Sequence, residues 1–514
     1  MAQVWSYDGV LHSKPFRFKK GMKSMDPTND LSGQSSGTRR NFLKKAAAAT
    51  LISMTSGSKA EAELPARKKP NIVLFISDQF RADFLHANND NPTTVTPNLD
   101  SIAMRGTNFN HCVTNQPLCT PSRGCLFTGR YATQTGTWKL GLGFHHGVKT
   151  IADAVREHGY TANYIGKWHL APFNAKTGQG EKGFVAPEHR GGFNGLWEAS
   201  NVLELTTEPY QGTIWSGDGS PIHFQDTYRA DFLTGLAVNF LKQDHKNPFL
   251  LVISQLEPHH QNNMHAFVPP KRYEEKFKNP FVPHDLRPFP GIWYSDLPGY
   301  YGSVEAIDDS VGTVLQTLKE QNLLEDTIFV FVSDHGNHFK TRNSEYKRSG
   351  HDASIRIPLL MQGPNLNDGG TIENIVSMVD VAPTILDAAG IPVPAAMDGR
   401  SMMPLVRKEP AREHWRDEAY VQISESMTAR AIRTREWTYC AVDPDSVQYG
   451  DDPYGKSYRD YQLYNNAADP AQIINLAGRV DHNKILSEFR DRLRLWLKDV
   501  GEPVVPISPA LFYP

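Results

Sequence analysis

The sequence predicts an α/β fold: a large, mixed but mostly parallel sheet sandwiched by helices, then a smaller α+β subdomain on a short antiparallel sheet. Asn71–Ser77 and Thr327–Ser333 are continuous apolar runs, the pattern of strands buried on both faces of a parallel sheet. From about Glu413 the pattern changes to short alternating runs that end in one helix. A length of 514 residues exceeds what one hydrophobic core supports, which favours two domains of unequal size.

The composition excludes some classes of function. A formal net charge of -2 and a pI near 6.8 argue against a nucleic-acid partner, which would favour a basic face. The charge balance names no substrate. The cysteines are too few for a disulfide framework and lack the paired spacing of a zinc site; they are Cys112, Cys119, Cys125 and Cys440.

Residues 1–62 are predicted to be an export leader that lies outside the fold. Twin arginines in Thr38–Lys44 precede a short apolar run, Ala46–Met54, and then small residues, the pattern of a Tat signal. A disordered basic tail is the alternative, and Met25 is a second candidate for the start of the chain. The apolar run is too short to span a bilayer, and no other segment is apolar enough to do so. We therefore expect a periplasmic or secreted protein that is not membrane-embedded and that depends on the Tat machinery.

The two buried-strand patterns end in the same way. Asn71–Ser77 is followed by Asp78 and Gln79, and Thr327–Ser333 is followed by Asp334 and His335. In open α/β sheets, chemistry gathers at the carboxyl ends of the strands. Side by side in a parallel sheet, the two strands would bring two carboxylates to one edge, which suits a divalent metal ion. A single Asp in such a place is more often a turn residue, so the repeated pattern carries the prediction.

Pro117–Gly129 is the most distinctive segment of the chain. Thr120, Pro121 and Ser122 suit the first turn of a helix, where a proline needs no N–H and a hydroxyl can cap free amides. This places Cys119 at the positive end of a helix dipole beside Arg123. Both influences would lower the pKa of the thiol and stabilise a bound anion. A lone cysteine before a helix is more often a small buried residue.

The segment before residue 170 contains two further helices and one strand. Helices are predicted from Thr96 to Met104, with Gly106 as the stop, and over Thr150–His158. A strand over Thr161–Ile165 leads into Lys167 and His169. These two residues are two positions apart on an extended segment, so their side chains point to the same face. Such a pair suits a joint anion and proton site.

Glu181–Thr227 is rich in glycine, aromatic residues and histidine, and we interpret it as an irregular insertion that shapes a pocket. Asn262–Tyr300 contains many prolines and is predicted to be a surface excursion. The predicted regular elements are the helices Asp231–Leu241, Tyr301–Lys319, Asp380–Ala389 and Asn483–Val500, and the strands Pro248–Gln255, Ala419–Ile423, Thr428–Ala441 and Tyr461–Tyr464. We divide the chain into a leader, a catalytic domain over 63–410 and a C-terminal subdomain over 411–514.

Two of these segments resemble the signatures of one enzyme family. Pro117–Gly129 resembles the signature of the type I sulfatases, in which the Cys of Cys-x-Pro-Ser-Arg is oxidised to formylglycine after translation. Gly159–His169 resembles the second signature of that family, with Ala162 where Ser or Thr is usual. The resemblance extends over nearly all of residues 70–500 and implies an alkaline-phosphatase-like fold. It also implies a formylglycine-generating enzyme as a maturation partner.

The family resemblance implies a role for each candidate residue. Cys119 would become formylglycine, whose hydrate attacks sulfur with help from a divalent cation. Arg123 would hold that hydrate, and Lys167 and Lys347 would clamp the sulfate oxygens. His169 would act as the base that releases sulfate, and His259 as the acid that protonates the leaving alcohol. Three alternatives remain at this stage: His260 could stand for His259, Lys347 could be an exposed surface lysine, and His351 is a further substrate-binding candidate.

The predicted metal shell departs from the best-known family pattern. Gln79 stands where that pattern has a second acid, and His335 stands where it has Asn. Calcium prefers oxygen ligands, whereas imidazole suits transition ions such as manganese. The arrangement resembles the choline-sulfatase and phosphonate-monoester-hydrolase branch. The resemblance implies one divalent cation, calcium by family and manganese as the alternative, held by Asp78, Gln79, Cys119, Asp334 and His335.

The expected function is hydrolysis of a sulfate monoester, with a sulfated glycan as the favoured substrate. Aromatic and polar side chains in Glu181–Thr227 would stack on sugar faces and bind hydroxyl groups. A phosphonate monoester or phosphodiester hydrolase is the nearest alternative, because a clamp for a tetrahedral anion does not distinguish sulfur from phosphorus. A non-catalytic binding protein with an unmodified Cys119 is the more distant one.

Overall fold

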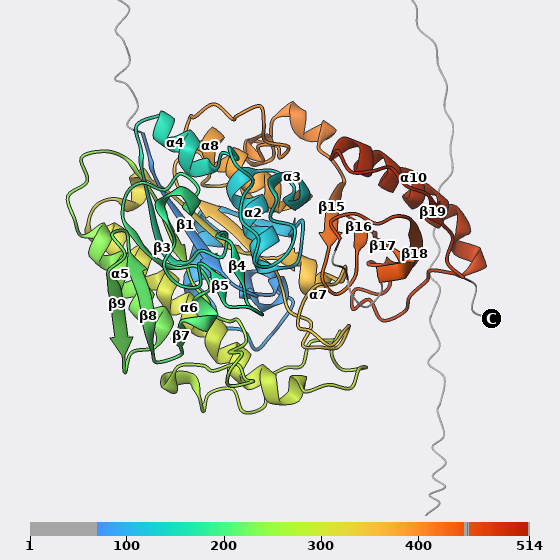
Figure 1. Cartoon of the computed structure of the whole chain (residues 1–514), viewed down its shortest axis with the longest axis horizontal. Helices are drawn as coiled ribbons and strands as arrows, with labels where there is room; N and C mark the ends of the chain where they lie inside the picture. Colours follow the sequence, from blue (N-terminus) through green and yellow to red (C-terminus); the bar gives the residue numbers. More distant parts are fainter. Residues whose placement is uncertain (1–68, 447–449, 451, 512–514) are drawn as a thin grey trace, which may run out of the picture. The chain divides into compact units, whose positions relative to one another are not determined.

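The computed structural model describes residues 69–446, 450 and 452–511; the predicted export leader, residues 1–62, lies outside them. A twelve-stranded mixed sheet forms the centre of the fold (Figure 1). Its main path runs β12 (Arg356–Ile357), β2 (Thr107–Val113), β13 (Leu359–Gln362), β11 (Thr327–Ser333), β1 (Asn71–Ser77), β10 (Phe249–Ser254), β3 (Thr161–Lys167), β6 (Trp197–Ser200), β8 (Gln211–Ser216) and β7 (Thr207–Glu208). Two more strands lie off this path: β14 (Gly370–Ser377) pairs with β2, and β9 (Pro221–Gln225) pairs with β8.

The middle of the sheet is parallel, as predicted. β11, β1, β10, β3 and β6 are joined by parallel pairings, and antiparallel strands flank them on both sides. β1 and β11 are direct neighbours, with Ser77 paired to Ser333. The two Ser-Asp strand ends therefore lie side by side at the carboxyl edge of the sheet.

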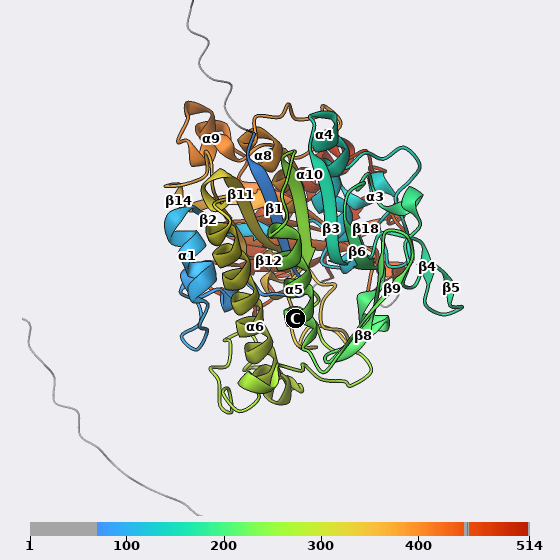
Figure 2. The same cartoon turned by 90° about the vertical axis from the view of Figure 1, so that its left-hand side faces the viewer.

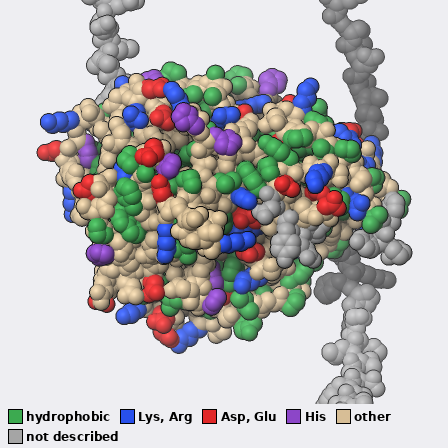
Figure 3. All heavy atoms as spheres, in the orientation of Figure 1, with side chains coloured by type: hydrophobic (Ala, Val, Ile, Leu, Met, Phe, Trp, Pro, Cys, Tyr) green, Lys and Arg blue, Asp and Glu red, His purple; other side chains and the backbone are tan. Residues whose placement is uncertain are grey.

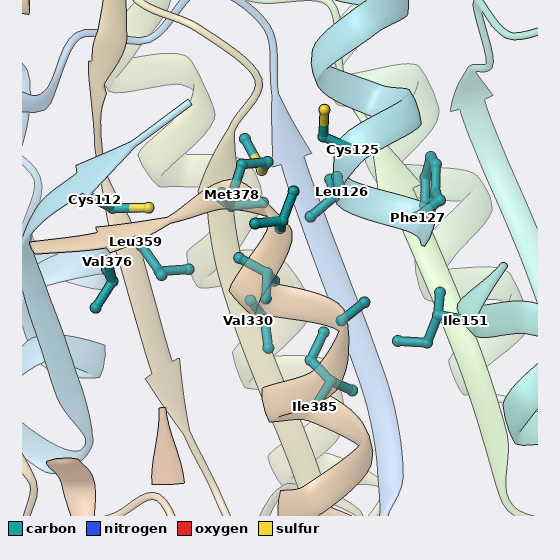
Figure 4. Close-up of a cluster of buried hydrophobic side chains, with 14 of the residues drawn as sticks. Cys112, Cys125, Leu126, Phe127, Ile151, Val330, Leu359, Val376, Met378 and Ile385 are labelled. Atoms are coloured by element: carbon teal, nitrogen blue, oxygen red, sulfur yellow. The ribbon is translucent and has the colours of Figure 1, made fainter. Parts of the chain in front are cut away.

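Helices cover both faces because the central strands carry apolar side chains on both faces of the sheet. From β1, Ile72, Leu74 and Ile76 enter one hydrophobic cluster, and Val73 and Phe75 enter the other. The first cluster packs under α2 (Cys119–Thr128), α4 (Ile151–Glu157) and α8 (Val381–Ala388), and Figure 4 shows part of it. The second packs under α1 (Pro97–Arg105), α5 (Arg229–Leu241) and α6 (Trp293–Glu320), of which α5 and α6 cross the sheet in Figure 2.

A second, five-stranded sheet follows in the C-terminal part of the chain. Its order is β15 (Glu418–Ile423), β16 (Ala429–Thr434), β17 (Trp437–Val442), β18 (Tyr458–Asn465) and β19 (Ile507–Ser508), with α10 (Asn483–Asp499) packed against it. The single predicted strand Thr428–Ala441 is wrong: it is a hairpin, because Arg435 and Glu436 form the turn between β16 and β17. The terminal pair β18–β19 is parallel, so the sheet is not wholly antiparallel. The boundary at 410/411 stays a prediction.

Two segments differ from expectation. Glu181–Thr227 is not irregular, since β6 joins the edge of β3 and β8 and β9 extend the sheet from there. Two of its aromatic side chains point inward: Phe193 and Trp197 pack against Tyr164 in the core. These two are therefore not part of the sugar-stacking platform that the composition suggested.

The long helix α6 begins at Trp293, eight residues before the predicted start at Tyr301. Pro298 and the glycines beside it argued against a helix there. Tertiary packing outweighs that local preference, because Leu297 and Tyr300 are buried and the Tyr300 ring lies 4.7 Å from that of Phe84. The surface excursion is shorter than predicted for the same reason.

The shorter elements include α3 (Ala132–Thr135), α7 (Asp352–Ile355), α9 (Met403–Val406), a hairpin of β4 (Phe173–Asn174) with β5 (Gln179–Gly180), and several 3₁₀ turns. Within the described ranges, every helix is too short or too polar to cross a membrane. Acidic and basic side chains lie interspersed on the face that Figure 3 shows, in keeping with the near-zero net charge.

Candidate active site at the carboxyl edge of the sheet

Arg123 joins the two acids that end β1 and β11. Its Nη2 lies 3.1 Å from Asp78 Oδ2, and its Nε lies 3.1 Å from Asp334 Oδ2. All three side chains are fully buried. Burial would lower the pKa of Arg123, but Asp334 and Asp78 act more strongly and raise it above its ordinary value. A charged guanidinium thus holds the two carboxylates at a fixed spacing.

Cys119 is the first residue of α2 and lies directly above these acids. Its Sγ lies 3.1 Å from Lys347 Nζ, 3.4 Å from His335 Nε2 and 3.8 Å from Asp78 Oδ1. Burial would raise the pKa of the thiol, yet the charges of Lys167 and Lys347 hold it well below its ordinary value. The predicted direction of the shift is therefore right. Its main source differs, because the guanidinium of Arg123 is turned toward the carboxylates.

The hydroxyl groups at the start of α2 do not cap the helix, contrary to the sequence-based expectation. Leu118 is the N-cap, and no side chain caps the free amides. The Thr120 hydroxyl instead donates to the backbone carbonyl of His169 at 2.8 Å, and the Ser122 hydroxyl donates to that of Asp334. These bonds tie the cysteine-bearing helix to two other loops of the site.

Four side chains form a group that fits a metal ion. One donor atom from each of Asp78, Cys119, Asp334 and His335 lies within 4.8 Å of the others, and all four residues are buried. His335 Nδ1 lies 2.9 Å from the carbonyl of Gly336, which fixes Nδ1 as the donor and leaves the lone pair of Nε2 facing the group. Two carboxylates and a neutral imidazole are suitable ligands for a divalent cation.

Gln79 lies beside this group in an unusual conformation. Its φ is 70°, and its backbone N–H donates to Asp334 Oδ1 at 3.1 Å. The side-chain Nε2 is buried without a hydrogen-bond partner among the described residues. The backbone of Gln79 thus positions a carboxylate, and a ligand role for its side chain stays a prediction.

Lys167 and His169 converge, as their spacing predicted, although His169 has a φ of 59° and leaves the strand geometry. Lys167 Nζ lies 2.8 Å from Asp78 Oδ2 and 3.0 Å from Glu204 Oε1, and His169 Nδ1 lies 3.6 Å from the same Glu204 oxygen. Burial would raise the pKa of Glu204, but Lys167 and His169 lower it to about 2. Glu204 is therefore an ionised member of the site.

The sequence interpretation missed Glu204. It lies on a 3₁₀ turn, Leu203–Leu205, inside the segment that was interpreted as an irregular insertion. One feature of the sequence could have indicated it: Glu204 stands between two leucines. A charged side chain in an apolar context is buried only when it is paired with an opposite charge. Its partner Lys167 comes from another strand, so the pairing itself depends on the tertiary fold.

His259 lies at the mouth of the site. Its Nε2 is 3.1 Å from Lys347 Nζ, and its Nδ1 is 2.6 Å from the carbonyl of His260. His260 instead packs its ring between Tyr346 and Phe267, and burial lowers its pKa to about 4. Of the two adjacent histidines, His259 therefore reaches the Cys119 cluster. Lys347 is buried there too, not exposed on the surface.

Comparison with known proteins identifies the family. Residues 70–391 match the family described as Sulfatase, and residues 345–499 match the one described as N-sulphoglucosamine sulphohydrolase, C-terminal.

The chain belongs to the sulfatase family.

Relatives of this sulfatase span most of its length. The ulvan-active sulfatase of Formosa agariphila is 28% identical and covers 88% of this chain and 86% of its own. The N-acetylglucosamine-6-O-sulfatase of Bacteroides thetaiotaomicron is 24% identical and covers 86% of this chain and 89% of its own. The choline-sulfatase of Rhizobium meliloti is 26% identical and covers 86% of this chain and 90% of its own. The solved structure of the sulfatase yidJ from Bacteroides fragilis has a TM-score of 0.71 at 23% identity and covers 87% of this chain and 99% of its own, so the fold is shared. The sulfatase is accordingly a sulfuric ester hydrolase.

His351 is the one predicted site residue that the sulfatase structure places elsewhere. Its Nδ1 lies 3.1 Å from the Ser349 hydroxyl and its Nε2 lies 3.1 Å from the Tyr464 hydroxyl. It lines a separate cavity together with Arg81 and Asp285, and burial holds its pKa well below the ordinary value. Because both ring nitrogens are occupied, this placement does not support the predicted role of His351 in binding substrate.

Apart from Cys119, the formal charges of the site balance. Arg123, Lys167 and Lys347 face three carboxylates, those of Asp78, Asp334 and Glu204. Burial and the nearby Asp78 raise the pKa of Asp334, so the carboxylates repel each other despite Arg123. A divalent cation and an anionic ester bring opposite charges, so the pair can enter this balanced site together more easily than either alone.

We expect Glu204→Gln to lower kcat by roughly 10–100-fold, the usual loss when an outer partner of a metal site is changed, because Glu204 pairs with Lys167, which contacts the candidate ligand Asp78. The change removes the charge that holds Lys167 and orients His169, while it keeps the size of the side chain. Steady-state kinetics with an aryl sulfate measure the effect. Glu198→Gln, at a partly buried position on β6, is the matched control. Equal kcat values for both variants and the unmodified protein would contradict a role for Glu204.

Proposed function

We propose that this sulfatase cleaves a carbohydrate sulfate monoester to an alcohol and inorganic sulfate, with Cys119 matured to formylglycine. The observation that carries the proposal is the position of Cys119 Sγ, within 3.1–3.8 Å of a lysine, a histidine and an aspartate. The thiol marks the place of the oxygen nucleophile that formylglycine would supply. A divalent cation held by Asp78, Asp334 and His335 would supply charge neutralisation and polarisation of an attached oxygen. Calcium suits the carboxylates, and the imidazole makes manganese the second candidate.

The chain's own side chains cover the other requirements of the reaction. Lys347 and Lys167 neutralise charge on the non-bridging oxygens of the ester. His259 donates a proton from Nε2 to the leaving alcohol oxygen as the bond between sulfur and that oxygen breaks. His169, whose Nδ1 lies 3.6 Å from Glu204 Oε1, accepts the proton whose loss from residue 119 releases the bound sulfate.

Two features support a carbohydrate as the organic part of the ester. A cavity of about 690 Å³ adjoins Glu204, and hydroxyl and amide side chains line much of it. One relative is named for N-acetylglucosamine 6-O-sulfate, and such a sugar presents the hydroxyl groups that these side chains bind. A relative named for choline sulfate represents the competing small-ester substrate. Turnover of small aryl or choline esters with no turnover of any sulfated sugar would contradict the proposal.

Mass spectrometry of the peptide that contains Cys119 tests the nucleophile. In protein from a host with a formylglycine-generating enzyme, we expect residue 119 to have lost its sulfur and two hydrogens and gained one oxygen. An intact thiol in fully active protein would refute the proposed maturation. An intact thiol in inactive protein of native origin would instead favour the non-catalytic binding protein.

A direct competition of substrates addresses the phosphonate alternative. A clamp for a tetrahedral anion accepts a sulfur or a phosphorus centre. Matched aryl sulfate and aryl phosphonate monoesters are therefore compared on one preparation. We expect the sulfate ester to have the higher kcat/KM.

For localisation we propose Tat export to the periplasm or beyond, and cell fractionation that finds the mature protein only in the cytoplasm would contradict it.

A further inference from the structure

A cavity of about 690 Å³ opens beside the sulfate clamp. Three segments form its walls: the chain after Glu204, through β7 into β8, the strand β9, and the loop after His259. The cavity is lined by Glu204, Leu205, Thr206, Thr207, Glu208, Gln211, Gly212, Thr213, His223, Phe224, Gln225, Asn262 and Asn263. It therefore lies where the part of a substrate next to the sulfated group would extend.

The cavity is negatively charged, whereas the two side chains that would clamp the sulfate, Lys167 and Lys347, are positively charged. Its lining contains two carboxylates, Glu204 and Glu208, and neither a lysine nor an arginine. The lysine side of the site meets the cavity at the ion pair between Lys167 Nζ and Glu204 Oε1, which lie 3.0 Å apart. An anion is thus favoured on one side of Glu204 and disfavoured on the other.

Glu204 and Glu208 also offer hydrogen-bond acceptors. The Glu204 side chain is 7% exposed, and its Oε2 has no hydrogen-bond partner among the described residues, although it is buried. A buried carboxylate oxygen without a partner is costly, so a donor from a ligand would stabilise it. Glu208 is exposed, and it accepts from Gln211 Nε2 at 2.8 Å and from Asn263 Nδ2 at 3.1 Å. These bonds hold its charge in the cavity wall.

We propose that this cavity binds the sugar next to the sulfated one and selects an uncharged, hydroxyl-bearing sugar over one that carries a second sulfate. The inference rests on the proposed function, because it concerns the substrate of the same site. Hydroxyl groups can donate to the two carboxylates and exchange hydrogen bonds with the amides. A second sulfate would lie against Glu204 and Glu208, with neither a lysine nor an arginine in the lining to neutralise it.

Two disaccharides that differ only in a second sulfate on the neighbouring sugar test the selection. We expect kcat/KM to be at least about tenfold higher for the monosulfated one, since like charges across an interface are strongly disfavoured. The ratio should shrink at high salt, because the exposed carboxylate of Glu208 is screened. A small aryl sulfate, which does not reach the cavity, reports the hydrolysis itself.

Substitution of Glu208 assigns the effect to the cavity. Glu208→Gln should reduce the ratio and Glu208→Lys should reduce it further or reverse it, with aryl sulfate turnover unchanged. Glu488→Lys, at an exposed position on α10, is the charge-matched control and should leave the ratio unchanged. Equal kcat/KM values for both disaccharides, or an unchanged ratio in Glu208→Lys, would overturn the inference while aryl sulfate turnover persists. If the unmodified protein hydrolysed none of the three substrates, the proposed function would be wrong, and the inference with it.

Discussion

Cys119→Ala is expected to lower kcat for an aryl sulfate by about 10⁴–10⁶-fold, the range that follows removal of a catalytic nucleophile. The side chain stands at the start of α2, where Lys347, His335 and Asp78 all approach it. Alanine leaves those residues in place but removes the sulfur atom that they converge on. Initial rates at saturating substrate measure the loss, and the heat-denaturation midpoint checks that the variant is folded.

A second cysteine supplies the control for this experiment. Cys440 is equally buried but lies in β17, in a hydrophobic cluster that the C-terminal sheet shares with Val113, Ile355 and Ile375. Cys440→Ala should retain nearly full kcat and show at most a modest loss of stability. If Cys119→Ala keeps more than a tenth of the rate of Cys440→Ala, the hydrolysis does not depend on residue 119.

The structure shows why the metal-site pattern could be predicted from the sequence. β1 and β11 are buried on both faces, so their apolar runs are uninterrupted and their ends are marked by the first charged residue. Both strands begin and end at the predicted residues. The sheet makes β1 and β11 neighbours with aligned ends. In the sequence, this arrangement was indicated by the Ser-Asp pair that follows the same pattern at both strand ends.

Other members of the site carried no comparable local signal. Glu204 meets Lys167 only because β6 adds to the edge of β3 and directs the following turn back over the site. Its segment is rich in glycine and aromatic residues, whose inward packing cannot be distinguished from a sugar platform by composition. The hydroxyls of Thr120 and Ser122 likewise looked like helix caps, because the loops that they contact are distant in sequence.

Lys347→Met is expected to lower kcat by about 10²–10³-fold, the usual cost of one group that stabilises developing charge. Its Nζ lies 3.1 Å from Cys119 Sγ, 3.1 Å from His259 Nε2 and 3.2 Å from His335 Nε2. The ammonium thus lies between the nucleophile position, the proposed acid and a candidate metal ligand. Methionine keeps the length and the apolar stem of the side chain while it removes the charge.

The separate changes in kcat and in KM then distinguish two roles for Lys347. If the ammonium acts mainly on charge that develops in the transition state, kcat and kcat/KM fall together; if it binds the sulfate equally in the ground state, KM rises and kcat is kept. Lys340→Met is the matched control, because Lys340 is exposed and its Nζ lies over the Tyr346 ring at 4.7 Å. Lys347→Arg should not restore the rate, since a planar guanidinium cannot occupy a point that three groups approach within 3.2 Å. Full activity in Lys347→Arg would mean that positive charge alone is needed there, and that the short contacts of Lys347 are not what accelerates the reaction.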